Sequence, residues 1–433
     1  MMGSGIDFLR LNYLKKLVSI EFLIFYILFN LMLSLAWHFN DLPAVAGTKW
    51  IIKSGEILSL SIPSNNYYPP GPALLSIPFS YFSNISLIST FFWANIGFIF
   101  FFLISHEIKN TFWNRIILGT FLINVYLFWN FKSSQDTVYE FAVVMISVYT
   151  LIKKKFIFAI MFLFLLFQVR SGYWLLFILV ALLLILKRKS LNLSRWFFAL
   201  PCGLLILSSL FNFISYGTLS PSNTSGQTLY FGQNKYFYLG HPSYDIDTFL
   251  DEGGHMTPPG YTREELWNRD LTELDDIFKE QAIKDIRSNP EIFIQNTIIK
   301  LDNLFFNFQK VPNLPGRYWL SADGKNIFIE GQGLNLKYAL GNFVYFLYRF
   351  ISVMLLIYSI SLWFYFRKFF KVSDIYYAVC NFLPIISIWP ICIIFYEDTR
   401  FRIISECLII PASAYLIIRT RKIKNHIVVG LIE

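Results

Sequence analysis

Ten apolar runs, most of them separated by short charged loops, constrain this chain of 433 residues more than any other feature. Apolar residues make up 55% of the chain and charged residues only 15%, a balance that excludes a soluble multi-domain protein. Runs of this kind cross a bilayer as helices. The sequence therefore predicts an all-α, polytopic transmembrane protein. The expected spans are residues 17–37, 85–104, 116–131, 138–152, 156–169, 173–186, 196–216, 341–366, 375–396 and 401–418.

Basic residues are unequally divided between the two sides of these spans. Of the 37 Lys and Arg residues, 19 fall in the termini and loops of one side, and only 6 fall in the short loops of the other side. Because basic loops stay in the cytoplasm, both termini are expected there. The loop after the first span is then expected outside.

Three regions follow from this pattern. Residues 1–216 form an N-terminal transmembrane module whose first outer loop covers 38–84, and residues 341–433 form a C-terminal transmembrane module. Between them, residues 217–340 are hydrophilic and carry 16 acidic and 11 basic side chains. This negative balance excludes a nucleic-acid surface in spite of the net charge of +9 for the whole chain.

Two helices are expected inside the region 217–340. Thr262 and Glu265 have the spacing of a capping box, which predicts a helix reaching about Ser288. A second helix, predicted over 291–308, carries apolar side chains at helical spacing. We expect it to lie along the outer membrane surface.

In the first outer loop, the carboxylate of Asp41 lies four residues after the first span. Further along, the stretch YYPPG places Tyr67 and Tyr68 at the boundary of lipid and water and ends in a rigid turn at Gly71. These residues are typical of a catalytic loop. They are equally compatible with a plain connector that has an aromatic anchor.

A second carboxylate is expected on the same side as Asp41. Asp136 follows Lys132 in the turn before the fourth span, and Glu140 extends this polar patch by one helical turn. Asp136 also has the position of a helix N-cap, so a capping role and a functional role stay open together.

Arg170 is expected below the outer surface. It lies in the turn between two predicted spans of about 14 residues, and each span is roughly 21 to 23 Å long at 1.5 Å per residue. The hydrocarbon core is about 30 Å thick, so the arginine needs a partner inside the protein, and an anionic ligand is the natural one. The alternative is an arginine that extends to the interface.

The loop before the tenth span is dense in charge. Arg402 lies four residues before Glu406, so we expect these two to pair and to leave Arg400 available for an anion. His241 and His255 lack metal-ligand spacing and are interpreted as ordinary polar residues. Nucleotide-binding, zincin and G-x-S-x-G motifs are absent from the sequence.

Taken together, several stretches resemble the C-type membrane glycosyltransferases (GT-C). The similar features are Asp41 after the first span, YYPPG before the second, SSQDT before the fourth, VRSG at the fifth turn, GQTLYFGQNKYFYLGH after the seventh span, and AIKDIRSNPEIFIQNTIIKLDNLFFN. Two departures leave the subfamily open. Ser171 stands where the family has a proline after the arginine, and Ile404 stands where another proline is expected.

This resemblance implies an enzyme that moves a sugar from a polyprenyl-phosphate carrier to a glycan or lipid-linked acceptor at the outer membrane face. The acceptor hydroxyl loses a proton as it attacks, so a carboxylate is needed, and we expect Asp41 to be the base with Asp136 beside it. Glu56 is the rival acid. A divalent cation between the two aspartates is compatible with the residues but is not required by their spacing. The expected ligands of the carrier phosphate are Arg170, Arg400 and Lys132, with Tyr67 and Tyr68 at the lipid boundary.

Two other functions stay open at this point. A polysaccharide polymerase or lipid-linked ligase also uses many spans and one large outer loop. A transporter or flippase is less consistent with the sequence, because the charges gather on one face and no paired broken spans are evident. A bacterial inner membrane is the expected location, and an envelope glycan such as the O-antigen of lipopolysaccharide is the expected product.

Cysteine labelling tests the predicted orientation. A cysteine introduced at Asn223 should react with a membrane-impermeant reagent in intact cells, whereas one at Ser190 should react only after permeabilisation. The unsubstituted chain, labelled in parallel, controls for its four native cysteines. The opposite pattern would invert the orientation and place Asp41 inside the cell.

Overall fold

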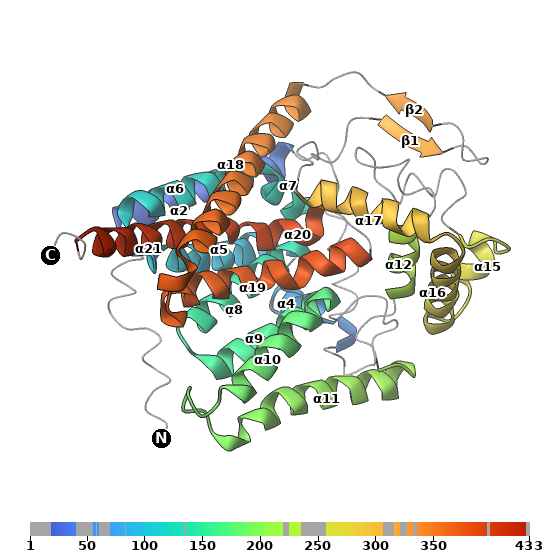
Figure 1. Ribbon diagram of the computed structural model, residues 1–433. Coiled ribbons are helices and arrows are strands. Elements are labelled where there is room, and N and C mark those ends of the chain that lie inside the picture. Colours follow the sequence, from blue (N-terminus) through green and yellow to red (C-terminus); the bar gives the residue numbers. More distant parts are fainter. Residues whose placement is uncertain are drawn as a thin grey trace.

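A computed structural model of the chain describes residues 19–39, 55–57, 59, 70–82, 84–133, 136–219, 225–234, 257–305, 316–320, 327–331, 336–395 and 399–429. These residues are almost entirely helical. Figure 1 shows a bundle of long helices with a smaller group of helices and a two-stranded hairpin beside it.

Apolar helices make up the bundle. They are α2 (Ile20–Phe39), α5 (Ile85–His106), α6 (Thr111–Leu122), α7 (Val125–Ser133), α8 (Asp136–Ile152), α9 (Phe156–Val169), α10 (Trp174–Leu186), α11 (Ala199–Tyr216), α18 (Leu336–Phe366), α19 (Val372–Ile394), α20 (Thr399–Glu406) and α21 (Ile409–Val429). Short elements join them: α4 (Gly71–Ser76), η2 (Ile77–Phe79), η3 (Ser171–Tyr173), η4 (Arg195–Phe198) and η5 (Arg367–Phe369).

In the described part of the chain, six helices are long and apolar enough to cross a membrane, or up to seven if the bent pair α6 and α7 is one span. The expected number of ten is therefore not confirmed. Helices α8, α9 and α10 have only 17, 14 and 13 residues. At 1.5 Å per residue they are roughly 20 to 26 Å long, which is shorter than the hydrocarbon core of about 30 Å. The six long apolar helices show a membrane-embedded protein.

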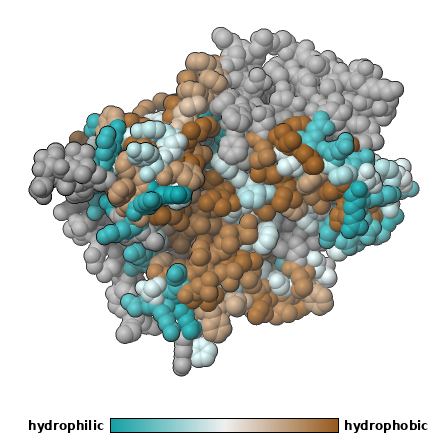
Figure 2. Space-filling view, in the orientation of Figure 1, coloured by the Kyte–Doolittle hydropathy of each residue, from teal (hydrophilic) through white to brown (hydrophobic). Residues whose placement is uncertain are grey.

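Helices at the edge of the bundle turn apolar side chains outward. On α11, Leu207 and Ile214 are 68% and 78% exposed, and on α2, Ile20 is 78% exposed. Figure 2 shows hydrophobic residues over the face formed by α10, α11 and α19, and hydrophilic residues over α15 and α16. An apolar surface of this extent fits lipid and not water.

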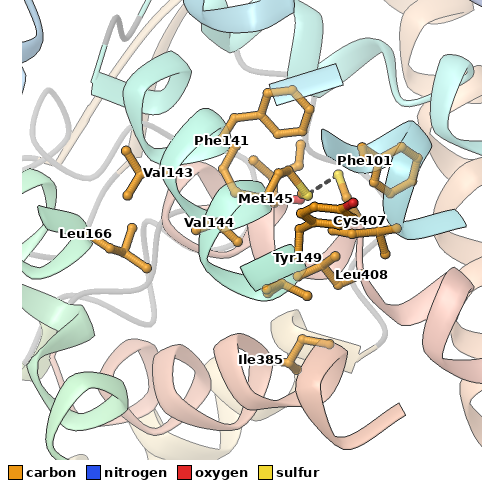
Figure 3. Close-up of a cluster of buried hydrophobic side chains, with 14 of the residues drawn as sticks. Phe101, Phe141, Val143, Val144, Met145, Tyr149, Leu166, Ile385, Cys407 and Leu408 are labelled. Carbon is orange, nitrogen blue, oxygen red and sulfur yellow. Dashed lines mark hydrogen bonds between the residues drawn. The ribbon is translucent and has the colours of Figure 1, made fainter. Parts of the chain in front are cut away.

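Helix α8 lies at the centre of the bundle. All its residues from Thr137 to Leu151 are buried, and it packs against α5, α9, α19 and α20. Figure 3 shows Met145 and Tyr149 of α8 beside Cys407, while Leu166 of α9 lies on the opposite side. A helix that is apolar almost all round is covered by lipid or by protein, and α8 is covered by protein on every face. Helix α8 therefore fixes the positions of its neighbours.

Charged residues gather at the two ends of the bundle, which we name the Lys153 end and the Arg170 end. At the Lys153 end, Lys153 Nζ lies 2.7 Å from Glu107 Oε2, and Arg115 Nε lies 3.4 Å from Glu21 Oε1. The first contact joins the residues after α5 and α8, and the second joins the first turns of α2 and α6. At the Arg170 end, the start of α8 meets the end of α9, and the end of α7 meets the end of α2. Helices α8 and α9 thus run antiparallel, whereas α5 and α8, and α2 and α7, run parallel.

The region 217–340 contributes the elements beside the bundle. They are α12 (Ser225–Gln233), α15 (Arg263–Trp267), α16 (Leu271–Ser288), α17 (Pro290–Phe305), and an antiparallel hairpin of β1 (Gly316–Leu320) and β2 (Ile327–Gly331). The capping box is confirmed, because Thr262 Oγ1 accepts the Glu265 N–H and Glu265 Oε2 accepts the Thr262 N–H. The expected single helix to Ser288 is wrong, because a new helix begins after Asp270, whose carboxylate accepts the N–H of Thr272. The hairpin was not expected from the sequence.

Helix α4, which begins at Gly71 of the YYPPG stretch, lies directly against the end of α9. A Cβ atom added to Gly71 would come within 2.5 Å of the backbone carbonyl of Gln168. The same helix is tied to α8, because Ser76 Oγ and the Tyr139 hydroxyl form a hydrogen bond of 2.8 Å. The glycine is thus required for close approach, and α4 is held beside the residues that lead into Arg170.

Substitution of Gly71 by Ala tests this approach. The new methyl group meets rigid backbone, so we expect a loss of about 1 to 3 kcal/mol in the free energy of unfolding, measured by thermal unfolding in detergent micelles. Gly203→Ala in α11 is the matched control, because no atom lies within 4 Å of the added carbon. A melting temperature of Gly71→Ala equal to that of the control would contradict the packing described.

Candidate functional site

Arg170 is the centre of a buried ionic cluster at the Arg170 end. The α-helix α9 ends at Val169, and Arg170 itself has extended backbone angles before the 3-10 turn η3. Its Nε lies 2.8 Å from Glu140 Oε2, and its Nη2 lies 3.3 Å from Asp136 Oδ2. The side chain of Arg170 is only 9% exposed. The arginine is therefore buried in the protein and paired, and its depth below the membrane surface stays a prediction.

Glu140 is the most deeply buried member of the cluster. Its side chain is fully buried, and it accepts a hydrogen bond of 2.7 Å from the hydroxyl of Tyr173, which is also buried. Asp136 and Glu140 are four residues apart on α8, so their carboxylates lie on the same face. A buried carboxylate is tolerated only when it is paired and hydrogen-bonded, and Arg170 and Tyr173 meet this need.

Asp136 is the more accessible carboxylate. It is the first residue of α8, and its side chain is 28% exposed. Anionic side chains are favourable in the first turn of a helix, so the position also stabilises α8. Its contact with Arg170 goes beyond a helix cap. The geometry gives an accessible acid held in one orientation by a buried arginine.

Lys132 contacts the end of α2, the helix that precedes Asp41 in the sequence. Its ammonium group donates a hydrogen bond of 3.1 Å to the carbonyl of Trp37 and lies 5.6 Å from the centre of the Trp37 ring. Trp37 is in the last turn of α2, and Asp41 is the second residue after the end of that helix at Phe39. The end of α2 is thereby fixed beside the end of α7.

Several predicted site residues lie outside the described residues. Asp41, Tyr67 and Tyr68 are in this group, and for Arg400 only its place in α20 is described and not its side chain. Glu56 is described in a short turn and is partly buried. The structure therefore brings together two of the predicted site residues, Asp136 and Arg170, and places Lys132 at the end of α7, the helix that precedes α8.

Glu406, the last residue of α20, pairs with a distant helix. Its Oε1 lies 2.6 Å from Arg349 Nη1 of α18, and both side chains are buried. The side chain of Arg402 lies outside the described residues, so its expected pairing with Glu406 stays a prediction. The signal for the pair of Arg349 and Glu406 was present in the sequence, because Arg349 lies inside a predicted span, where a charge needs a buried partner.

Tyr173 is a site residue that sequence reasoning missed. It follows Arg170 by three residues and was counted only as the first residue of a span. Its hydroxyl needs a partner when the ring is buried, and Glu140 was the nearest predicted acid inside a span. The pairing depends on how α8 and α9 pack, and sequence spacing alone does not give it.

Both described carboxylates of the cluster contact Arg170. An anionic ligand at this site would therefore compete with Asp136 and Glu140 for the arginine. Within the described residues, no group of three His, Cys, Asp or Glu side chains has the arrangement of a metal site. The cation considered between Asp41 and Asp136 stays a prediction, because Asp41 lies outside those residues.

Comparison of the chain with protein families, with curated proteins and with solved structures finds no match.

Substitution of Arg170 tests whether the cluster is a true buried ion pair. Arg170→Met leaves the fully buried Glu140 without its cation, so we expect a loss of about 3 to 5 kcal/mol in the free energy of unfolding. Removal of both charges in Arg170→Met/Glu140→Gln should restore part of this stability, because no unpaired charge remains. Thermal unfolding in detergent micelles measures both effects.

Arg115→Met is the matched control. This arginine is 67% exposed and pairs with Glu21 at the Lys153 end, so its loss should cost less than about 1 kcal/mol. Equal stability of Arg170→Met and Arg115→Met, or a double variant less stable than Arg170→Met, would contradict the pairing.

Proposed function

We propose that this protein is an inverting glycosyltransferase of the GT-C type, which moves a sugar from a polyprenyl-phosphate carrier to an envelope glycan or lipid-linked acceptor. The observation that carries the proposal is the buried cluster in which Arg170 orients Asp136 at the end of the bundle where α2 leads into Asp41. Asp41 is the proposed general base. Asp136 is the proposed second carboxylate of the site.

Covalent geometry supports the pairing of these two acids. Consecutive Cα atoms are about 3.8 Å apart, so the Cα of Asp41 lies within about 8 Å of the Cα of Phe39. The end of α2 is fixed to Lys132, four residues before Asp136. Both carboxylates are thus supplied to the same end of the bundle from elements that the structure holds in place.

The chemistry of the proposed reaction suits a site of this kind. The attacking hydroxyl of the acceptor gives its proton to a carboxylate as the new glycosidic bond forms, and the sugar's bond to the carrier phosphate breaks in the same displacement. The carrier phosphate leaves with its negative charge, which basic side chains stabilise in a site of low dielectric. Arg400 and Lys132 are the proposed main ligands of that phosphate. Arg170 binds the phosphate only by exchanging its contact with Asp136 or Glu140 for a contact with a phosphate oxygen.

We propose further that the Arg170 end faces outward and that both termini are cytoplasmic. The turns at the Lys153 end support this orientation. Lys109 and Lys154 adopt φ of 55° and 56°, where an L-residue is strained by roughly 1 to 2 kcal/mol and glycine is usual after a helix. Both turns at this end thus carry a lysine, and a face rich in basic residues is typical of the cytoplasmic side. A bacterial inner membrane is the proposed location.

Transport is the second candidate function, because one span is broken. The bent pair α6 and α7 meets at an angle of 49°, and Asn124 in the break lies 3.5 Å from Cys407 Sγ. The expectation concerned paired broken spans, and the described residues contain one bent pair. Broken helices bind substrates in many transporters. The transferase is preferred because the accessible acid lies at one end of the bundle, whereas transport uses a site near the middle of the membrane.

Asp41→Asn tests the proposed base. The amide keeps the size of the side chain and cannot accept the proton, so the turnover number for sugar transfer in membranes should fall about 10²- to 10⁴-fold at matched protein level. Asp136→Asn should lower turnover less, because Asp136 orients the site and is not the base. Glu56→Gln is the matched control and should keep near-normal turnover. If Glu56→Gln alone abolished transfer, the base would be Glu56 and the assignment of Asp41 would be wrong.

A further inference from the structure

The end of α19 is held by two side chains from the region 217–340. Lys300 of α17 donates a hydrogen bond of 2.5 Å to the carbonyl of Phe395, and Gln233 of α12 donates one of 2.5 Å to the carbonyl of Ile394. The last carbonyls of a helix have no partner within the helix and carry partial negative charge. Lys300 and Gln233 therefore cap α19 from outside the bundle.

Lys300 is fully buried, which is rare for a lysine and costs free energy unless the charge is compensated. Helix α17 turns its polar face toward protein: Asn296 is also buried and donates to the carbonyl of Asn234. The opposite face of α17 is apolar and open, with Ile294 and Ile298 exposed by 56% and 59%. The polar side chains of α17 thus face protein and its apolar side chains face outward. This packing of α17 directs Lys300 at α19.

Helix α12 is fixed at its other end as well. The carboxylate of Asp275 on α16 accepts the N–H of Gly226 at 2.7 Å and the hydroxyl of Ser225 at 2.9 Å. A Cβ atom on Gly226 would lie 2.0 Å from the backbone oxygen of Asp275, so α12 and α16 are in close contact. Helix α12 thus connects α16 to the end of α19.

On its other side, the same part of α19 packs against the turn of Arg170. A Cβ atom on Gly172 would lie 3.1 Å from Ile388 Cδ1 and 3.5 Å from Ile391 Cγ2. Ile391 lies one helical turn before Phe395, whose carbonyl Lys300 caps. About one turn of helix separates Ile391 from the lysine contact, and about two turns separate Ile388 from it.

We propose that Lys300 is a positioning residue for the candidate site. By capping α19, it sets the position of Ile388 and Ile391 along the helix axis, and these side chains hold the Gly172 turn so that Arg170 stays on Asp136 and Glu140. The region 217–340 is thereby mechanically joined to the carboxylate cluster. The consequence for sugar transfer rests on the proposed function, whereas the mechanical link does not.

A double-mutant cycle in melting temperature tests the link without any enzyme assay. Lys300→Met, Arg170→Met and the double variant are compared with the parent protein in detergent micelles. Loss of Lys300 should already weaken the Arg170 contacts. The fall in melting temperature of the double variant should therefore be smaller than the sum of the falls in the two single variants. Additive shifts would overturn the proposal. Gln233→Leu, a milder change at the same helix end, provides the same cycle if Lys300→Met does not fold.

Two further variants separate positioning from general destabilisation. Lys284→Met removes an exposed lysine of α16 and should leave both the melting temperature and the cycle unchanged. Lys300→Arg keeps the charge and the donor, so it should restore the coupling to Arg170. Failure of Lys300→Arg to restore it, or an equal effect of Lys284→Met, would overturn the proposal.

Sugar transfer gives a separate readout. A small displacement of a site can lower kcat/KM by about 10²-fold, so Lys300→Met should do so at matched protein level, and Lys300→Arg should recover it. If the parent protein transferred no sugar, the proposed function would be wrong. The coupling between Lys300 and Arg170 in melting temperature would still hold. Normal kcat/KM in Lys300→Met, with an active parent, would overturn the positioning role.

Discussion

The burial of Glu140 at the start of the central helix is the constraint on which the rest of the structure depends. A fully buried carboxylate is stable only with a cation and a hydrogen-bond donor beside it, and Arg170 and Tyr173 are brought there by the turn between α9 and α10. Other elements approach that turn closely, because α4 meets the Gln168 backbone at Gly71 and α19 meets Gly172 through Ile388 and Ile391. One buried charge thus fixes the packing of several helices and leaves Asp136 as the accessible acid.

A second buried ion pair has a similar effect on the other side of α7 and α8. Arg349 of α18 and Glu406 of α20 are both almost fully buried, and α20 packs against α7 and α8. Polar contacts of this kind contribute little net stability compared with an apolar core, but removal of one partner is costly. They therefore define which helices can be neighbours. This explains how a bundle made mainly of Phe, Leu and Ile acquires one arrangement at the end that carries the candidate site.

Much of this architecture could be predicted from the sequence, because apolar runs and their basic flanks are local signals. The predicted run 156–169 coincides with α9, and the prediction that Asp136 and Arg170 lie on one side is consistent with their contact. Long-range contacts could not be predicted in the same way. Glu406 pairs with Arg349 of a distant helix, because helix packing decides the partner of a buried charge and spacing along one helix does not. The hairpin of β1 and β2 was missed for a related reason, since two strands of five residues give a weak pattern.

The most direct test of the account is mass spectrometry of lipid-linked and envelope glycans from cells with and without the gene. The account predicts that loss of the gene removes one sugar residue from an envelope glycan and that the polyprenyl-phosphate-linked form of that sugar accumulates. A plasmid copy of the gene should reverse both changes. Unchanged glycans and carrier lipids, or carrier-linked sugar that accumulates only on the cytoplasmic side, would contradict the transferase and favour transport.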